Sequence, residues 1–139
     1  MNKSLLDTDI LSEVGKGINA TVTRNATAYR QAQGFLTLSV ISVMEAIPGY
    51  QRVGASNRIQ AFRNAIASEE VLLFEQNAAD LAGQIAGDLD RVGRPIGRCD
   101  PMIAAIAIIH GLELVTGNTS HYQRIQQLGY PLTLANWRI

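Results

Sequence analysis

Short apolar runs alternate along the chain with longer segments in which apolar residues recur at helical spacing. The apolar runs are Ser4–Leu6, Phe35–Ile41, Val71–Phe74, Leu112–Val115 and Leu132–Leu134. The helical spacing covers Ala20–Gln33, Ser56–Ser68, Asn77–Val92, Pro101–His110 and Ser120–Leu128. Strands that alternate with helices pair in parallel and use the helices as crossovers. The pattern therefore predicts an α/β fold with a central parallel β-sheet of four to five strands, flanked by helices on both faces.

Composition narrows the class of protein without identifying it. The 139 residues suit one domain, residues 1–139, and 47% apolar against 17% charged residues argues against disorder. Twelve basic and twelve acidic residues cancel, so any contact with a polyanion must use a local patch. The only cysteine, Cys99, fits a reducing compartment. The N-terminus lacks the apolar region of a secretory signal, and no apolar run is long enough to span a bilayer, so we expect a cytoplasmic protein.

Three acidic residues stand where an apolar stretch meets a polar turn: Asp7, Glu45 and Asp100. Open α/β sheets build their sites at the carboxyl ends of strands, so these distant residues are expected at one edge of the sheet. Carboxylates held close together repel one another unless a cation lies between them. Hard divalent cations such as Mg²⁺ prefer carboxylate oxygen. The three acids therefore predict a metal-dependent hydrolase.

Each acid also has a purely structural interpretation. Asp7 is a suitable turn former, and Asp9 fits the N-cap of the helix that follows. Asp100 precedes Pro101, which fits an acidic N-cap followed by proline at the first helical position. Capping and metal binding do not exclude each other, and the joint occurrence of the acids at one predicted edge favours the metal.

The interpretation of Glu45 depends on where its helix begins. Ser42 and Glu45 have the spacing of a capping box. Pro48 would then lie in the second turn, where it lacks a backbone donor and presses on the preceding turn. Either the helix kinks at Pro48 or it begins closer to Pro48, and the sequence leaves both open.

Four segments carry a resemblance to a known family: LLDTDILSE, SVISVMEAIPG, PIGRCDPMIAAIAIIHGLELVTGN and HYQRIQQLGYPLTLANW. In this order and spacing they resemble the PIN-domain ribonucleases, and most closely the VapC-type toxins of type II toxin–antitoxin pairs. The resemblance implies that Asp7, Glu45 and Asp100 bind Mg²⁺ or Mn²⁺, and that a metal-activated water hydrolyses RNA. It also implies a homodimer and a small antitoxin that blocks the acidic pocket.

The chain departs from this family at His121, where many relatives have a fourth acid. Imidazole suits Mg²⁺ poorly, so the lost charge is expected to weaken metal binding and to shift the preference toward Mn²⁺. Asn118, with a neutral oxygen, is the predicted fourth member of the catalytic set, and Asp9 is a weaker alternative. Thr116 also has a neutral oxygen, and it is predicted to contribute to substrate binding.

Basic residues precede the third acid. Arg94 and Arg98 are predicted to bind substrate phosphates, because arginine makes bidentate contacts with them. Arg98 lies closest in sequence to Asp100. The alternative is a solvated basic surface with no role in binding.

Two other functions remain open. Asp7-Thr8-Asp9 has the acid spacing of haloacid-dehalogenase-like phosphatases, but the only lysines are Lys3 and Lys16 and no later pair of acids appears. A catalytically impaired PIN-like module that only binds a partner is the second alternative, and the change at His121 is compatible with it.

Overall fold

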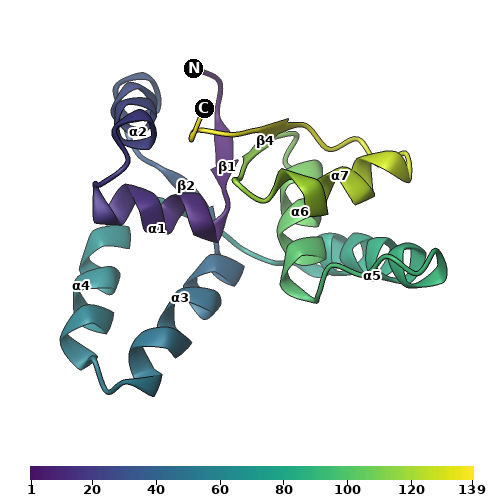
Figure 1. Ribbon diagram of the computed structural model, residues 1–139, viewed down its shortest axis with the longest axis horizontal. Helices are drawn as coiled ribbons and strands as arrows, with labels where there is room; N and C mark the ends of the chain where they lie inside the picture. The colour runs from purple at the N-terminus through teal and green to yellow at the C-terminus, as the bar shows by residue number, and fades with distance from the viewer.

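A computed structural model describes residues 1–139 (Figure 1). The strands are β1 (Ser4–Leu6), β2 (Thr37–Ser39), β3 (Glu70–Leu72), β4 (Glu113–Val115) and β5 (Leu134–Ala135). The helices are α1 (Thr8–Lys16), α2 (Ala20–Gln33), α3 (Val40–Arg52), α4 (Ser56–Ile66), α5 (Gln76–Arg91), α6 (Cys99–Ile109) and α7 (Thr119–Gln127). No helix is both long and apolar enough to cross a membrane.

Every strand pair is parallel, as predicted. Strand β4 lies between β1 and β5, and β2 pairs with β3. The predicted fold class is therefore confirmed, and the structure has five of the predicted four to five strands. The strands nevertheless form two hydrogen-bonded groups, because β1 and β2 lie side by side without a ladder between them.

The side chain of Tyr29, on α2, lies where β1 and β2 separate. Its hydroxyl accepts from the backbone N–H of Ser4 and donates toward the Ser4 carbonyl, both over 3.1 Å. The same hydroxyl is 3.1 Å from Oγ1 of Thr37 on β2. Tyr29 is fully buried, so this hydroxyl satisfies polar groups that a continuous ladder would otherwise pair.

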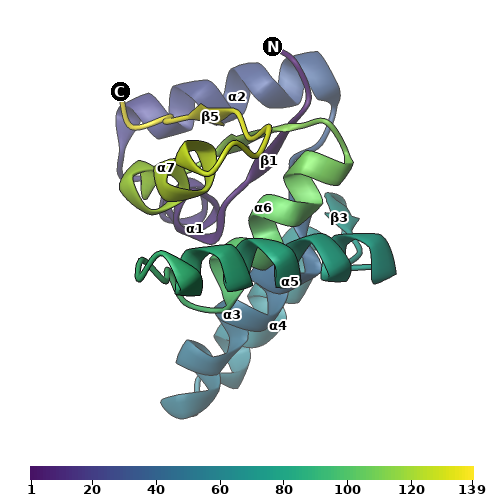
Figure 2. The same cartoon turned by 90° about the vertical axis from the view of Figure 1, so that its right-hand side faces the viewer.

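The two faces of the sheet contact different helices. Leu5 and Leu114 belong to a core that includes residues of α5, α6 and α7. Leu6 and Val115, one position further along each strand, belong to a second core formed with α1, α2 and Trp137. Successive side chains of a strand point to opposite faces, which accounts for this division. Figure 2 shows the resulting layers, with α2 on one side of β1 and α6 and α5 on the other.

The observed start of α3 settles the question about Glu45. Ser39 is the N-cap, with Oγ accepting from the backbone N–H of Ser42 over 3.4 Å. The capping box from Ser42 is therefore wrong. The helix begins at Val40 and continues through Pro48, which is exposed.

The predicted caps of α1 and α6 are also corrected. Asp7, not Asp9, is the N-cap of α1. Helix α6 begins at Cys99, so Asp100 lies in the first turn and makes no cap hydrogen bond. The Asp100 carboxylate instead points toward the carboxyl ends of β1 and β4.

Candidate active site

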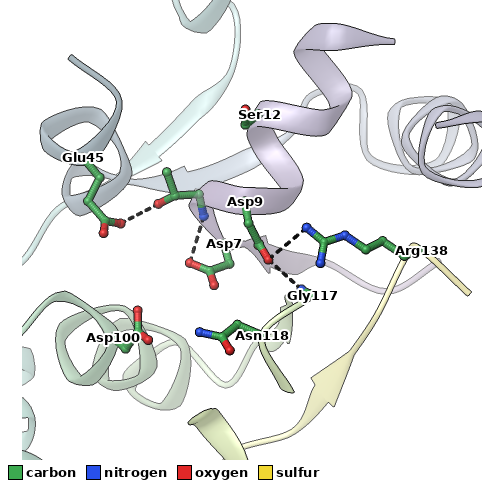
Figure 3. A pocket seen from close by; sticks show the side chains of 9 residues that line it. Asp7, Asp9, Ser12, Glu45, Asp100, Gly117, Asn118 and Arg138 are labelled. Atoms are coloured by element: carbon green, nitrogen blue, oxygen red, sulfur yellow. Dashed lines mark hydrogen bonds and ion pairs between the residues drawn. The ribbon is translucent and has the colours of Figure 1, made fainter. Parts of the chain in front are cut away.

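One polar cavity of about 560 Å³ brings the three predicted acids together (Figure 3). Its lining contains no hydrophobic residue and consists of Asp7, Thr8, Asp9, Ser12, Glu45, Asp100, Gly117, Asn118 and Arg138. Asp7 directly follows β1, and Gly117 follows β4 after one residue. The cavity therefore lies at the carboxyl end of two neighbouring parallel strands, where α/β folds place their sites.

Asp7 is the most buried of the acids, with 5% of its surface exposed. Its Oδ1 accepts from the backbone N–H of Thr8, and its Oδ2 accepts from Oγ1 of Thr116, both over 2.8 Å. Burial, reinforced by the neighbouring charge of Asp9, raises the pKa of Asp7 to about 6. The hydrogen bonds fix the carboxylate and lower its pKa, but by less than burial raises it.

Glu45 approaches the cavity from α3 and is held by Thr8. The Thr8 hydroxyl donates to Oε1 of Glu45 over 2.6 Å and lies 2.8 Å from Oγ of Ser42. A hydroxyl has one proton, and a carboxylate only accepts, so the Thr8 proton points to Glu45. The hydroxyl of Ser42 therefore donates to Thr8, and this relay orients Glu45 through two side chains.

Asp100 is oriented from α7. The hydroxyl of Tyr122 donates to Oδ1 of Asp100 over 3.2 Å, and Nδ1 of His121 lies 3.3 Å from Oδ2. Tyr122 is fully buried, and burial together with the charges of Asp7 and Asp100 raises its pKa well above the usual value. Tyr122 is therefore a permanent neutral donor beside the acids.

Asp9 has a different set of partners from the three predicted metal ligands. Its Oδ1 accepts from the backbone N–H of Ile10 over 2.7 Å, and its Oδ2 accepts from that of Gly117 over 3.0 Å. Nη2 of Arg138 lies 3.4 Å from the same Oδ2. Both carboxylate oxygens are thus engaged by the protein, although burial still raises the pKa of Asp9.

Asn118 lines the cavity, whereas His121 does not. The Asn118 amide nitrogen lies 2.8 Å from Nδ1 of His121, and its backbone N–H donates to Oγ1 of Thr116 over 3.0 Å. Thr116 is fully buried. The prediction that Thr116 contacts substrate is therefore corrected: its hydroxyl positions Asp7 from beneath.

The predicted phosphate-binding arginines lie outside the cavity. Arg94 is exposed and donates to the side chain of Gln127 over 2.9 Å. Arg98 is also exposed, and neither arginine lines the cavity. The basic residue that does line it, Arg138, was missed by sequence reasoning, as were Thr8 and Tyr122. The only signal for Arg138 was its position next to Trp137, an aromatic residue able to anchor the segment.

The chemistry of the cavity suits a hard cation. Its available ligands are carboxylate, hydroxyl and amide oxygens, which Mg²⁺ and Mn²⁺ prefer. Burial and the neighbouring charge of Asp9 raise the pKa of Asp7, so a cation beside this carboxylate would stabilise its ionised form. As the side chains stand, no three His, Cys, Asp or Glu residues are close enough together to hold a metal ion. Metal binding therefore requires side-chain rotation, with Glu45 and Asp100 the two acids free of backbone hydrogen bonds.

Comparison with known proteins agrees with this geometry. The PIN domain family model matches residues 4–126. A tRNA(fMet)-specific endonuclease VapC from Shigella flexneri is 35% identical over 126 residues, which cover 90% of this chain and 93% of that protein. The VapC ribonuclease Y4jK from Sinorhizobium fredii is 31% identical, with 86% of this chain and 89% of that protein covered.

A solved structure shares the fold over its full length. The DNA-bound VapBC from Salmonella typhimurium contains a chain that superimposes with a TM-score of 0.81 at 30% identity, and 99% of both chains is covered. Sequence family and three-dimensional structure thus lead to the same assignment. The chain belongs to the PIN-domain family, in its VapC group.

Proposed function

We propose that this chain is a metal-dependent endoribonuclease that acts as the toxin of a toxin–antitoxin module. The observation that carries the proposal is the convergence of Asp7, Glu45 and Asp100 on one cavity without an apolar lining residue. Relatives named as a tRNA(fMet)-specific endonuclease and as a ribonuclease support it.

In this proposal Asp7, Glu45 and Asp100 hold Mg²⁺ or Mn²⁺, and Asn118 contributes a neutral oxygen as the fourth member of the site. When bound, the ion supplies an activated water and neutralises charge on the scissile phosphate. The protein's own contribution is orientation. Thr116 fixes Asp7 through Oδ2, which leaves the Asp7 carboxylate with little freedom to rotate.

Thr8 and Tyr122 have corresponding positioning roles for the other two acids. Each donates one hydrogen bond to a single oxygen, at Oε1 of Glu45 and at Oδ1 of Asp100. The second oxygen of Asp100 also lies 3.3 Å from Nδ1 of His121, so a cation at this oxygen competes with the imidazole. Such partners limit how far a metal ligand can turn as it moves toward the ion, and they increase metal affinity.

The partners in this proposal are RNA, a small cognate antitoxin and a second copy of the chain. Support for the antitoxin comes from solved VapBC complexes of Salmonella typhimurium and of nontypeable Haemophilus influenzae, to which the chain is similar. An antitoxin that covers the acidic cavity would block access to the metal. An RNA substrate and the unpaired Cys99 fit action in the cytoplasm.

The structure does not favour the phosphatase alternative. Lys3 pairs with Glu70 over 2.6 Å, and neither Lys3 nor Lys16 lines the cavity. The cavity therefore lacks the lysine that a haloacid-dehalogenase-like phosphatase requires beside its acids. The partner-binding module without catalysis is the second candidate, and it is favoured by the present spacing of the acids, of which no three are close enough to hold a metal ion.

Asp100→Asn tests the proposal. We expect loss of RNA cleavage and of growth arrest, because Asp100 gives up a metal-binding charge while Tyr122 can still donate to the amide oxygen. The matched control is Asp90→Asn, an exposed acid of α5 outside the cavity, which should leave cleavage unchanged. A toxic Asp100→Asn protein would refute the catalytic assignment. Antitoxin binding by a wild-type protein that cuts no RNA with Mg²⁺ or Mn²⁺ would favour the binding module.

A further inference from the structure

Arg138 is the only basic residue in a cavity that also contains four carboxylates, those of Asp7, Asp9, Glu45 and Asp100. An RNA phosphate that approaches these acids meets repulsion, which a bound divalent cation only partly offsets. Arg138 keeps 35% of its side chain exposed, so it remains accessible from the cavity. It is therefore placed to attract the substrate directly.

The guanidinium of Arg138 makes one hydrogen bond within the protein, from Nε, and one longer ion pair, from Nη2. Nε donates to Oε1 of Glu13 over 2.8 Å, and Nη2 lies 3.4 Å from Oδ2 of Asp9. Nη1 makes no hydrogen bond to the protein, and Oε2 of Glu13 is buried without a partner. Glu13 thus accepts from Nε through one oxygen only. No carboxylate binds Nη1 and Nη2 together. The Nη1–Nη2 end of the guanidinium matches two oxygens of a phosphate.

The backbone around Arg138 is held in place, so the side chain is not a loose terminal group. Trp137 is 5% exposed and packs against Tyr29, with ring centroids 5.7 Å apart. Asn25 donates to the carbonyl of Trp137 over 3.1 Å, and the N–H of Arg138 donates to the side chain of Asn136 over 2.9 Å. These contacts fix the direction in which the arginine leaves the chain.

Gly117 makes room for the guanidinium. A β-carbon built at residue 117 would lie 1.8 Å from Nη1 of Arg138, a distance that no side chain tolerates. The guanidinium therefore lies directly over the backbone that follows β4, beside the cavity (Figure 3). Asp9, which accepts from Gly117 and pairs with Arg138, holds the two segments together.

From this arrangement we propose that Arg138 binds a substrate phosphate at the rim of the acidic cavity, with Asp9 and Glu13 as the residues that position its guanidinium. This assignment rests on the proposed ribonuclease function. It replaces Arg94 and Arg98, which lie outside the cavity, as the phosphate contact. Asp9 is accordingly a positioning residue for Arg138 and not a ligand of the metal.

Binding of a short fluorescein-labelled single-stranded RNA, measured by fluorescence anisotropy with MgCl₂ present, tests this assignment. Asp100→Asn is the common background, so that the RNA stays intact. Arg138→Ala should weaken binding about tenfold, the equivalent of one charge-assisted hydrogen-bonded contact. The slope of log affinity against log salt should become shallower by about 0.7, as expected for one lost phosphate contact to a single strand. Arg138→Lys should retain the salt slope, because the charge is kept. It should bind RNA less tightly, because lysine lacks the two parallel N–H donors of the guanidinium.

Two further variants separate substrate binding from a structural role. Glu13→Gln removes the ion pair but keeps the charge of Arg138, so it should leave the salt slope unchanged. Arg63→Ala, at an exposed arginine of α4 without an ion pair, is the charge-matched control and should bind like the background protein. The assignment is overturned if Arg138→Ala binds RNA with the same affinity and the same salt slope as the Asp100→Asn background. A difference between their melting temperatures would not change this conclusion. Cleavage by Asp100→Asn itself would instead refute the catalytic role of Asp100, and a wild-type protein that cuts no RNA with Mg²⁺ or Mn²⁺ would refute the proposed function, so these failures are distinguishable from that of the Arg138 assignment.

Discussion

The hydroxyl of Tyr122 donates to Oδ1 of Asp100 over 3.2 Å, and Tyr122 has no solvent exposure. This buried donor holds Oδ1 of the carboxylate, while Oδ2 lies 3.3 Å from Nδ1 of His121. Because the raised pKa of Tyr122 keeps its proton in place, the contact persists over the whole physiological pH range. The orientation of Asp100 therefore depends on this buried hydroxyl and on the half-exposed imidazole of His121.

Tyr122→Phe removes only that hydroxyl. We expect the affinity for Mn²⁺ to fall about tenfold, the usual effect of losing a partner of a metal ligand. Isothermal titration with MnCl₂ measures it. Tyr130→Phe is the matched control, because Tyr130 donates to Asp88 outside the cavity. Equal Mn²⁺ affinity in all three proteins would show that Asp100 needs no such support.

Asp7→Asn is expected to stabilise the metal-free protein at pH 7.5. The pKa of Asp7 in the folded state, about 6, lies above the ordinary value of 3.8, so the folded protein holds this proton more tightly than the unfolded chain. The stabilisation from protonation is complete below pH 3.8 and is lost as pH rises through about 6. At pH 7.5 the ionised carboxylate costs about 1–3 kcal/mol, which asparagine avoids.

Thermal unfolding in EDTA tests this sign. The advantage of Asp7→Asn over wild type should be largest near pH 7.5 and shrink toward pH 5. Saturating Mg²⁺ should reverse the order, because only wild type gains stability from the ion. A variant that melts below wild type at pH 7.5 in EDTA would contradict the account.

His121→Asp places a carboxylate next to Asp100 and Asn118, where the family resemblance puts a fourth acid. An added charge at this half-exposed position should raise Mg²⁺ affinity roughly fivefold and lower stability in EDTA, since it adds to uncompensated negative charge. Titration with MgCl₂ and melting in EDTA measure the two effects. His121→Asn removes the imidazole without adding charge and serves as the control. A gain in affinity from His121→Asn as well would mean that the imidazole obstructs the site.

Tyr29→Phe should reduce the free energy of unfolding by about 2–4 kcal/mol, because buried backbone groups of Ser4 lose their partner. Urea unfolding checks the magnitude. Tyr50→Phe, at a tyrosine whose hydroxyl makes no hydrogen bond within the protein, should change it far less. Equal losses in the two variants would mean that water readily replaces the Tyr29 hydroxyl.

The sequence predicted the elements well because their signals are local. Helix α2 has the predicted bounds Ala20–Gln33, with Asn19 as the cap and Gly34 at its end. Strand β1 is also found where the apolar run Ser4–Leu6 placed it. The least accurate bounds are those of β2, because the apolar run Phe35–Ile41 continues into helix α3 and only Thr37–Ser39 form the strand.

Helix starts were less predictable, because several residues near each boundary can act as caps. Ser39 and Ser42 are both suitable for α3, and only Ser39 has the extended backbone of an N-cap. At α6 the Asp-Pro signal favoured Asp100 as the cap. Tertiary contacts with Tyr122 and His121 direct its side chain to the cavity instead.

The acids of the site were found because each adjoins an apolar stretch of the sequence, and their partners were missed because those partners come from elsewhere in the chain. Thr8 and Tyr122 carry no local signal of a site, and the only signal for Arg138 is the neighbouring Trp137. Arg138 reaches the cavity only because Trp137 is anchored on α2, which no periodicity in the sequence reveals. Arg94 and Arg98 were favoured by proximity in sequence to Asp100, whereas the fold places a distant arginine closer.

The absence of a β-carbon at Gly117 links two positions that lie far apart in the chain. Among homologous proteins, a side chain at the position of Gly117 and a long basic side chain in this pose at the position of Arg138 should exclude each other. The two sites are then expected to co-vary, and a substitution at one would first require a compensating change at the other.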